Sequence, residues 1–292
     1  TGSLKWSAVA IVGLIALAVV APSGLLLLGF LGLVITVHEA GHFVVARRTG
    51  MRPTEFFWGF GPVLLAVERN GCRYGLRLLF VGGYVKLHGM TPSADLPEGF
   101  EERDTFRAAS PGARLATILA GPGVNLVLAG MAFGVAAALE GASAGSALSR
   151  SYGDLWFVVS GTVESLGLWA ATIDDYVRSV FDPSASEAPV RFLSPVGQAE
   201  VSAVAVDGGI VSVLRWFGIL SAAVGVVNML PLPPLDGAHA VVAVVDGALR
   251  RLRPLRSASL DVSRAAPIAY VTIVVLVALS VSALVLDLRD LG

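Results

Sequence analysis

The sequence predicts an all-α polytopic membrane protein with a small membrane-associated β element. Its 292 residues are 55% hydrophobic and only 15% charged, well below the roughly 25% of charged residues in soluble domains. Long apolar stretches alternate with breaks rich in Gly and Pro, and the mean hydropathy is +0.75. The net charge of −1 offers none of the basic surface by which nucleic-acid-binding proteins are recognised, and the single Cys72 rules out an internal disulfide framework.

The apolar stretches predict four core transmembrane helices and one extra hydrophobic segment at the N-terminus. Residues 7–20 are apolar but fall short of the roughly 20 residues that cross a bilayer. Ala21-Pro22-Ser23-Gly24 then breaks the run, so residues 1–24 form the extra segment. The four core spans are predicted at residues 25–46, 113–139, 210–230 and 266–286.

The stretch between the first two core spans predicts strands. Asn70-Gly71 lies between the strand-like runs 63–69 and 72–77, and Asn-Gly in that position is a strong hairpin signal. Residues 78–87 read as another strand pair or as one bent strand, because the pair Gly82-Gly83 favours a tight turn or a close backbone approach.

Residues 140–207 are predicted to form an extracytoplasmic linker and an amphipathic helix. The stretch 141–153 is rich in Gly, Ala and Ser, a composition typical of linkers. Residues 155–181 mix apolar and charged side chains, which favours an interfacial helix over a span. No strand-rich module such as a PDZ domain is expected here.

The distribution of positive charge predicts the topology. Of the 21 Lys and Arg residues, 16 fall at position 5, between 47 and 114, or between 250 and 264. Basic residues mark the cytoplasmic side of a membrane protein. We therefore expect residues 47–112 to be cytoplasmic and residues 140–207 to lie outside.

The motif His38-Glu39-x-x-His42 predicts a metal site near the end of the first core span. Positions i and i+4 of a helix share one face, so both imidazoles can reach one ion, and Glu39 can reach a water bound to it. In a soluble helix the same motif can simply face water. In an apolar segment such groups must be paired, ligated or beside a wet cavity.

Asp236 is the best candidate for a third ligand. A catalytic zinc usually takes three protein ligands and keeps the fourth position for water. Asp236 follows the third core span at the depth and on the side of His42. The Pro-rich segment 231–234 prevents a regular helix, and irregular backbone at membrane depth is tolerated only inside protein or beside a wet cavity. The alternative is an Asp that faces water at a Pro-rich helix end.

Two further polar residues have open assignments. Asn125, inside the second core span, suits either a hydrogen bond between helices or a supporting contact to a metal ligand. His88 follows the last strand and is more often a surface residue than a ligand.

The two motifs together resemble the bacterial branch of the site-2 protease family, which consists of zinc metalloproteases that cut substrates within the membrane. The resemblance covers residues 25–139 and 208–287 and rests on these elements: His38-Glu39-x-x-His42, Gly59-Phe60-Gly61, Gly82-Gly83-Tyr84-Val85-Lys86, Ala120-Gly121-Pro122 with Asn125, and Asn228-x-x-Pro231-x-Pro233-x-Leu235-Asp236-Gly237.

The resemblance implies a role for each matching residue. His38, His42 and Asp236 are expected to hold zinc, and Glu39 to activate the water. Asn228 is expected to position the substrate or to stabilise the oxyanion. The strand Gly82, Gly83, Tyr84, Val85 and Lys86 is expected to bind substrate as an added strand, and His239 to support the metal ligands together with Asn125.

The resemblance also implies an architecture, partners and a location. Residues 25–139 and 208–292 would be the two catalytic halves. Substrates would be single-span membrane proteins, of the anti-sigma-factor or signal-peptide-remnant type. The protein would be a multi-pass protein of the bacterial inner membrane, with its active site toward the cytoplasm. The PDZ domains that many bacterial members carry have no counterpart in residues 140–207.

Two alternatives stay open at the level of sequence. A metal transporter also uses His, Glu and Asp inside the membrane, but it is expected to have related halves, and the two motifs here are unlike each other. A non-catalytic scaffold derived from the family would normally lack Glu39 or a ligand, and all are present.

Overall fold

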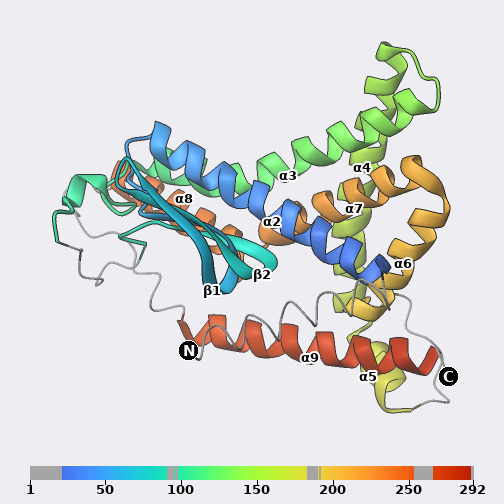
Figure 1. Cartoon of the computed structure of the whole chain (residues 1–292). Coiled ribbons are helices and arrows are strands. Elements are labelled where there is room, and N and C mark those ends of the chain that lie inside the picture. The colour runs from blue at the N-terminus through green and yellow to red at the C-terminus, as the bar shows by residue number, and fades with distance from the viewer. Residues whose placement is uncertain are drawn as a thin grey trace. The chain divides into compact units, whose positions relative to one another are not determined.

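The computed structural model describes residues 22–90, 96, 98–182, 190, 192–252 and 266–290 (Figure 1). The predicted N-terminal segment 7–20 lies outside these residues. The elements are α2 (Pro22–Arg48), β1 (Glu55–Arg69), β2 (Cys72–Lys86), the 3₁₀ turn η1 (Glu102–Asp104), α3 (Pro111–Leu139), α4 (Ala144–Ala171), α5 (Ile173–Phe181), α6 (Pro195–Asp207), α7 (Gly209–Asn228), α8 (Asp236–Leu252) and α9 (Ala266–Asp290).

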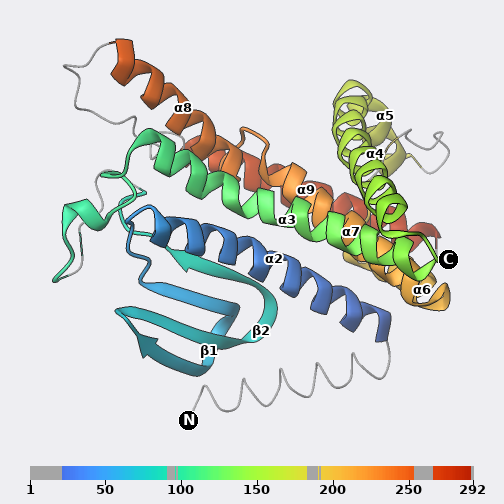
Figure 2. The ribbon, with the colours of Figure 1, turned by 90° about the horizontal axis from the view of Figure 1, so that it is seen from above.

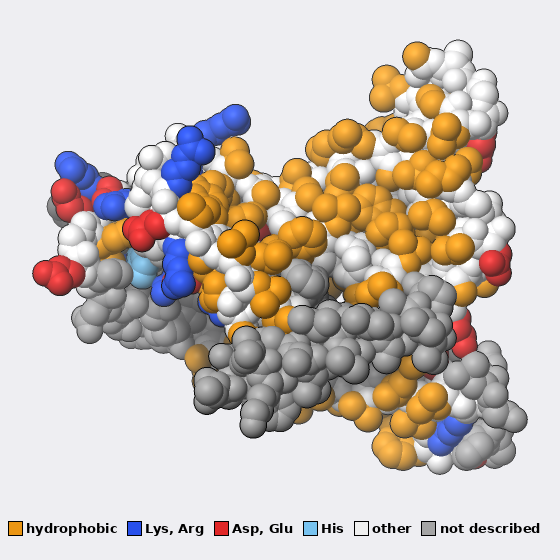
Figure 3. All heavy atoms as spheres, in the orientation of Figure 1, with side chains coloured by type: hydrophobic (Ala, Val, Ile, Leu, Met, Phe, Trp, Pro, Cys, Tyr) orange, Lys and Arg blue, Asp and Glu red, His pale blue; other side chains and the backbone are white. Residues whose placement is uncertain are grey.

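Four of these helices are long and apolar enough to cross a membrane. They are α2, α3, α7 and α9, and they confirm the four predicted core spans. Their outward faces carry exposed apolar side chains, for example Val127, Met131 and Val135 at one-turn intervals on α3, each at least half exposed. Such a stripe suits contact with lipid. The space-filling view shows hydrophobic side chains over α2 and the helices behind it, whereas Lys and Arg gather near the end of α2 and the strands (Figure 3).

The chain divides into two compact units, and α2, α3, α7 and α9 each contribute to both. The described part of the first unit lies in Leu28–Asn125 and Val227–Thr272, and that of the second in Leu14–Leu27, Leu126–Val226 and Ile273–Gly292. The predicted metal ligands all belong to the first unit.

The first unit packs α2 between α3 and the two strands (Figures 1 and 2). Helix α2 ends where Gly50 adopts φ +87° and the amide of Met51 donates to the carbonyl of Ala46, a Gly-based helix stop. Arg47 and Arg48 in its last turn complement the helix dipole. Behind the helix lies a core cluster, formed by Ala46, Met51, Phe106, Ile118 and Ala243.

The two strands form the predicted hairpin. Arg69 pairs with Cys72 across Asn70 and Gly71, whose φ angles of 51° and 69° are both positive. Two positive φ angles define a type I′ turn, which Asn-Gly favours. The hairpin prediction is therefore confirmed.

Residues 78–87 belong to one bent strand and not to a separate strand pair. Residues 55–58 of β1 pair with residues 73–76 and also with residues 83–86 of β2, so β2 passes along both sides of the start of β1 (Figure 2). The bend in β1 requires Gly59, which has φ +89°; a Cβ there would lie 2.6 Å from the carbonyl oxygen of Leu79. Residues 83–86 are thereby left at an edge of the sheet.

The second unit packs α3 and α7 antiparallel. Ala129 and Phe133 of α3 form a buried cluster with Ala222 of α7, and Gly218 of α7 leaves room for the Phe133 ring. As the residue numbers rise along α3, the contacted numbers fall along α7. The end of α3 therefore lies beside the start of α7, where Arg215 bonds the carboxylate of Glu140.

The linker predicted for residues 141–153 is wrong from Ala144 onward. Helix α4 begins there, with the hydroxyl of Ser143 accepting from the amide of Ser146 as an N-cap, and its Ala residues favour helix more than loop. The single amphipathic helix predicted for 155–181 is two helices, α4 and α5, bent by 72°. The bend falls at Thr172, whose hydroxyl bonds back to the carbonyl of Leu168.

Candidate metal centre

Helix α2 presents His38 and His42 on the face that turns toward α3. Both side chains are buried, with 5% and 9% of their surfaces exposed. Gly41 lies between them, and a Cβ there would lie 2.6 Å from the carbonyl oxygen of Ala120. The two helices therefore meet backbone to backbone beside the two imidazoles, a contact that only a small residue permits.

Asp236 reaches the same place from the start of α8. The segment before it makes a run of tight turns, in which the amide of Leu232 donates to Leu230 and that of Leu235 donates to Leu232. Gly237 follows directly, and a Cβ at that position would overlap the carbonyl oxygens of Met229 and Leu230. The Pro-rich segment and Gly237 thus shape the turn that delivers the carboxylate.

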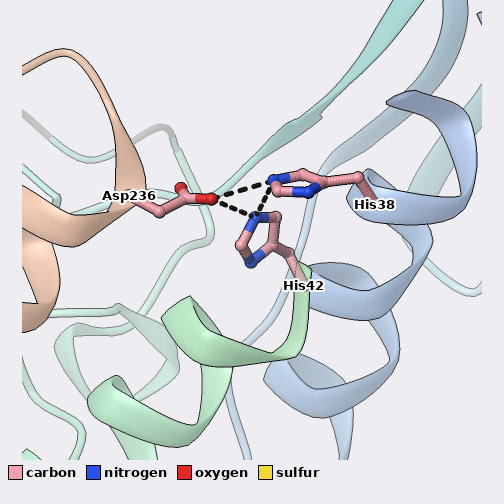
Figure 4. A group of neighbouring side chains, drawn as sticks. All are labelled: His38, His42 and Asp236. Atoms are coloured by element: carbon pink, nitrogen blue, oxygen red, sulfur yellow. Dashed lines mark hydrogen bonds and ion pairs between the residues drawn. The ribbon is translucent and has the colours of Figure 1, made fainter. Parts of the chain in front are cut away.

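The three predicted ligands converge (Figure 4). Asp236 Oδ2 lies 2.8 Å from His38 Nε2 and 3.3 Å from His42 Nε2, and the two Nε2 atoms are 3.1 Å apart. Ligand atoms around a tetrahedral zinc lie about 3.3 Å from one another when each bond is about 2.0–2.1 Å. The three separations are close to that value, so two imidazole nitrogens and one carboxylate oxygen are placed as zinc requires.

Partners on the far side of each imidazole support the same use of Nε2. His42 Nδ1 lies 2.7 Å from the carbonyl oxygen of Thr117, which can only accept, so the proton is on Nδ1 and Nε2 is free to bind metal. His38 Nδ1 lies 3.2 Å from the side-chain amide of Asn125. If the Asn125 amide is rotated by 180°, its oxygen takes the place of its nitrogen and can accept a hydrogen bond from a proton on His38 Nδ1. Both contacts orient the rings toward one point.

Glu39 lies outside the ligand group. Its Oε2 accepts a hydrogen bond from the backbone N–H of Val85, 3.0 Å away. This amide lies in the outer segment of β2 and points away from β1, toward α2. The sequence alone did not predict this contact, because nothing in the pattern of either element encodes which amide faces the helix.

The five predicted substrate-binding residues divide between two directions. Val85 faces Glu39, and Gly83 lies against α2, where a Cβ would be 3.6 Å from the hydroxyl of Thr36. The side chains of Tyr84 and Lys86 instead contact the carboxylate of Glu55, at 2.7 and 3.0 Å. The hydrogen bond from the Tyr84 hydroxyl, with help from Lys86, lowers the pKa of Glu55. Gly82 adopts φ +111° where β2 bends.

Asn228 and His239 lie near the ligands but not among them. Asn228 ends α7 and lines a cavity of about 250 Å³ together with Asp236. His239 lies one turn after Asp236 on α8, and burial lowers the pKa of its imidazole. The remaining histidine, His88, contacts the hydroxyl of Thr54 at 3.0 Å and is not one of the grouped ligands.

Residues 26–276 match the model of peptidase family M50. The chain belongs to this family, the site-2 proteases. The M50 match includes both motifs that supply the three converging ligands, and so agrees with the resemblance drawn from the sequence.

Several relatives within the family are named as zinc metalloproteases. Zinc metalloprotease Rip1 of Mycobacterium tuberculosis is 39% identical over 94 residues, which are 32% of this chain and 23% of the relative. Regulator of sigma-E protease RseP of Salmonella typhimurium is 42% identical over 104 residues, 35% of this chain and 23% of the relative. A Rhizobium meliloti protein with a zinc metalloprotease name is 26% identical over 80% of this chain and 88% of its own length. The chain thus spans about a quarter of the length of the first two relatives.

Proposed function

We propose that this M50 chain is an intramembrane zinc metalloprotease. It hydrolyses a peptide bond within or near the transmembrane segment of single-span membrane proteins, such as anti-sigma factors or signal-peptide remnants, in regulated intramembrane proteolysis. The observation that carries the proposal is the convergence of His38, His42 and Asp236 beside a helix that is long and apolar enough to span a bilayer.

The three grouped residues would hold the zinc. Zinc in that position acts as a Lewis acid, which polarises a carbonyl and makes water more acidic. The carbonyl of Thr117 and the amide of Asn125 keep the two imidazoles in the orientation that this requires.

Glu39 would act as general base and then as general acid. It accepts one proton from the attacking water and delivers it to the nitrogen of the scissile bond, so that the C–N bond breaks and an amine leaves. Its position one residue after His38 places it beside the ligands, and its carboxylate faces the strand edge. Asn228, beside Asp236, would help to position the substrate.

The outer segment of β2 would bind the unwound substrate. A transmembrane helix satisfies its own carbonyls, so a scissile bond becomes accessible only after local unwinding, and the freed backbone groups then need partners. The Val85 amide faces away from β1, and its partner in this structure is Glu39. Pairing of substrate with this edge follows the logic of β-augmentation.

We place the protein in the bacterial inner membrane, with the active site toward the cytoplasm. The distribution of Lys and Arg supports this orientation, since 16 of the 21 fall at position 5, between 47 and 114, or between 250 and 264.

Glu39→Gln tests the chemistry, because it keeps the size of the side chain and removes its basicity. We expect close to one zinc per chain, and a loss of cleavage of roughly 10²–10⁴-fold, the usual contribution of a general base. Elemental analysis and cleavage of candidate single-span proteins in detergent measure the two quantities. Glu68→Gln, an exposed carboxylate on β1, is the matched control and should behave like the parent.

Asp236→Asn should lose both zinc and activity, because an amide oxygen is a much weaker zinc ligand than a carboxylate. The contrast between the two variants is diagnostic. Cleavage at the parental rate by Glu39→Gln would show that the protease mechanism is wrong, and normal zinc content in Asp236→Asn would place the third ligand elsewhere.

A further inference from the structure

A groove leads away from Asp236, one of the three proposed metal ligands, between α3 and α8. Its first part, about 250 Å³, is lined at one end by Asp236 and Asn228. Its second part, about 570 Å³, extends to Pro111 and Arg251. Val244 lines both parts, and the other lining residues of the two parts follow one another along the same pair of helices. Both ribbon views show the start of α3 alongside α8 (Figures 1 and 2).

Rigid elements form this groove. Arg114 of α3 and Asp246 of α8 make an ion pair in which both side chains are at least 96% buried. Gly247 brings the helices so close that a Cβ there would lie 3.1 Å from Pro111. The groove is therefore preformed by two helices that are held together along its length.

The lining changes from charged to apolar and back to charged. Among the described residues that line it, the charged ones are Asp236, at the metal end, and Arg251, at the far end. Between them the walls are apolar, with Leu119 on α3 and Val241 and Val244 on α8, all three at least a third exposed. Such a lining suits an apolar chain that carries a negative charge at one end.

The length of the groove sets the length of its occupant. Asp236 and Arg251 are 15 residues apart on one helix, which is about 22 Å at 1.5 Å per residue. An extended peptide rises about 3.3 Å per residue. About seven extended residues therefore reach from the metal ligands to the guanidinium of Arg251.

We propose that this groove binds the flank of the substrate on one side of the scissile bond. The flank is apolar and extended, and it carries an Asp or Glu about seven residues from the bond, paired with Arg251. The inference rests on the proposed protease function and adds a rule for substrate selection. Continuity with Asp236 and Asn228 favours a peptide, because the terminal methyl of a lipid chain would be poorly placed beside a carboxylate and an amide.

A preference for an acidic flank would exclude most membrane proteins as substrates. Cytoplasmic flanks of membrane proteins are enriched in Lys and Arg. With the basic end of the groove on that side, Arg251 repels such flanks and accepts the less common acidic ones. A like-charge contact of this kind excludes wrong partners more than it strengthens right ones.

A charge exchange tests the pairing. The probes are synthetic single-span peptides with a Leu/Ala transmembrane segment, in which one Asp, Asn or Lys is moved along both flanks; mass spectrometry locates the cut. For the parent we expect kcat/KM to be about three-fold higher for the peptide with Asp than for the peptide with Asn at about seven residues from the bond. The difference should lie in KM, and its size is that of an exposed ion pair. Arg251→Glu should reverse the preference to Lys, and the control Arg48→Glu, an exposed Arg at the end of α2, should not.

A plug tests occupancy. A Cβ at Gly112, which lines the far part of the groove, meets nothing within 4 Å, so the position has room for a side chain, and the ring of Gly112→Phe is expected to obstruct the groove. We expect KM for the parental best peptide to rise about ten-fold, with zinc content unchanged. Gly145→Phe, at an equally open position on α4, is the control and should match the parent.

The outcomes separate the rule from the function beneath it. Cleavage with no positional Asp preference, or an unchanged KM in Gly112→Phe, overturns the groove while the protease function stands. Loss of copurified phospholipid in Gly112→Phe with KM unchanged would assign the groove to lipid and also overturn it. A parent that binds zinc but cleaves no peptide overturns the proposed function and the rule together.

Discussion

Gly121 is the residue on which the geometry of the metal centre most depends, apart from the ligands themselves. It lies on α3 directly against both imidazoles: a Cβ there would overlap His42 Nε2 and lie 2.7 Å from His38 Nε2. Those nitrogens are the proposed ligand atoms, so any side chain at position 121 would occupy the space where they converge.

Gly121→Ala should therefore displace the histidines. We expect zinc content to fall well below one per chain, and the free energy of unfolding to fall by about 1–3 kcal/mol, as for other overpacked sites. Elemental analysis and thermal unfolding measure the two effects. Gly123→Ala is the matched control: it lies on the same helix two residues on, its Cβ meets nothing within 4 Å, and both quantities should match the parent. Full zinc binding by Gly121→Ala would contradict this assignment.

Residue types and spacing predicted that His38, His42 and Asp236 come together, but not the close contacts around them. The three residues could be singled out because few other functions explain ionisable groups at membrane depth. The small residues of Ala120-Gly121-Pro122 are compatible with close helix packing. That Gly121 faces the imidazoles depends on how α3 is rotated about its axis, and a helix that is apolar on most sides does not encode its rotation in one sequence.

At the scale of elements, the contact between α2 and the edge of β2 links Glu39, the proposed base, to the strand edge proposed to bind substrate. The N–H of Val85 points away from β1 and donates to Glu39, 3.0 Å away. A substrate strand that pairs with this edge would take over that amide. Docking of the substrate and release of the Glu39 carboxylate would then occur together.

Val85→Pro should impair cleavage by at least about ten-fold while zinc remains bound, because proline has no amide hydrogen to donate. Val85→Ala keeps the amide and shortens only the side chain, so it should cleave at close to the parental rate. Kinetics with a full-length single-span substrate, together with zinc content, distinguish the two variants. Equal cleavage rates for Val85→Pro and Val85→Ala would show that the strand edge does not bind substrate.

Some of the elements could be predicted from local sequence signals, and others could not. The hairpin at Asn70-Gly71 and the four core spans could be predicted, because a type I′ turn and a bilayer-length apolar run each have a strong local signature. Helix α4 could not, since a stretch rich in Gly, Ala and Ser is compatible with both linker and helix. In the structure its start is capped by Ser143, and its buried face packs in the second unit, where the hydroxyl of Ser151 bonds the carbonyl of Gly130 on α3.

At the scale of the whole molecule, the packing of α3 against α7 limits how often the chain crosses the membrane. Because the two helices are antiparallel, Glu140 at the end of α3 meets Arg215 near the start of α7. The intervening helices α4, α5 and α6 must therefore leave and return on one side. The bent pair α4–α5 cannot then be a fifth complete span between α3 and α7, although its two helices together are long and apolar enough.

Cysteine labelling in intact bacteria tests this count and the proposed orientation. In a Cys72→Ala background, Gly145→Cys and Asp207→Cys should both react with a membrane-impermeant maleimide from outside, because they lie at the two ends of the α4–α6 segment. Glu101→Cys, in the loop before α3, should react only after permeabilisation. All three positions are exposed, so a lack of reaction reports sidedness and not burial. Labelling of positions 145 and 207 from opposite sides of the membrane would show that α4–α5 crosses it. If all three positions react with the reversed sidedness, the number of spans stands, but the metal centre lies toward the outside.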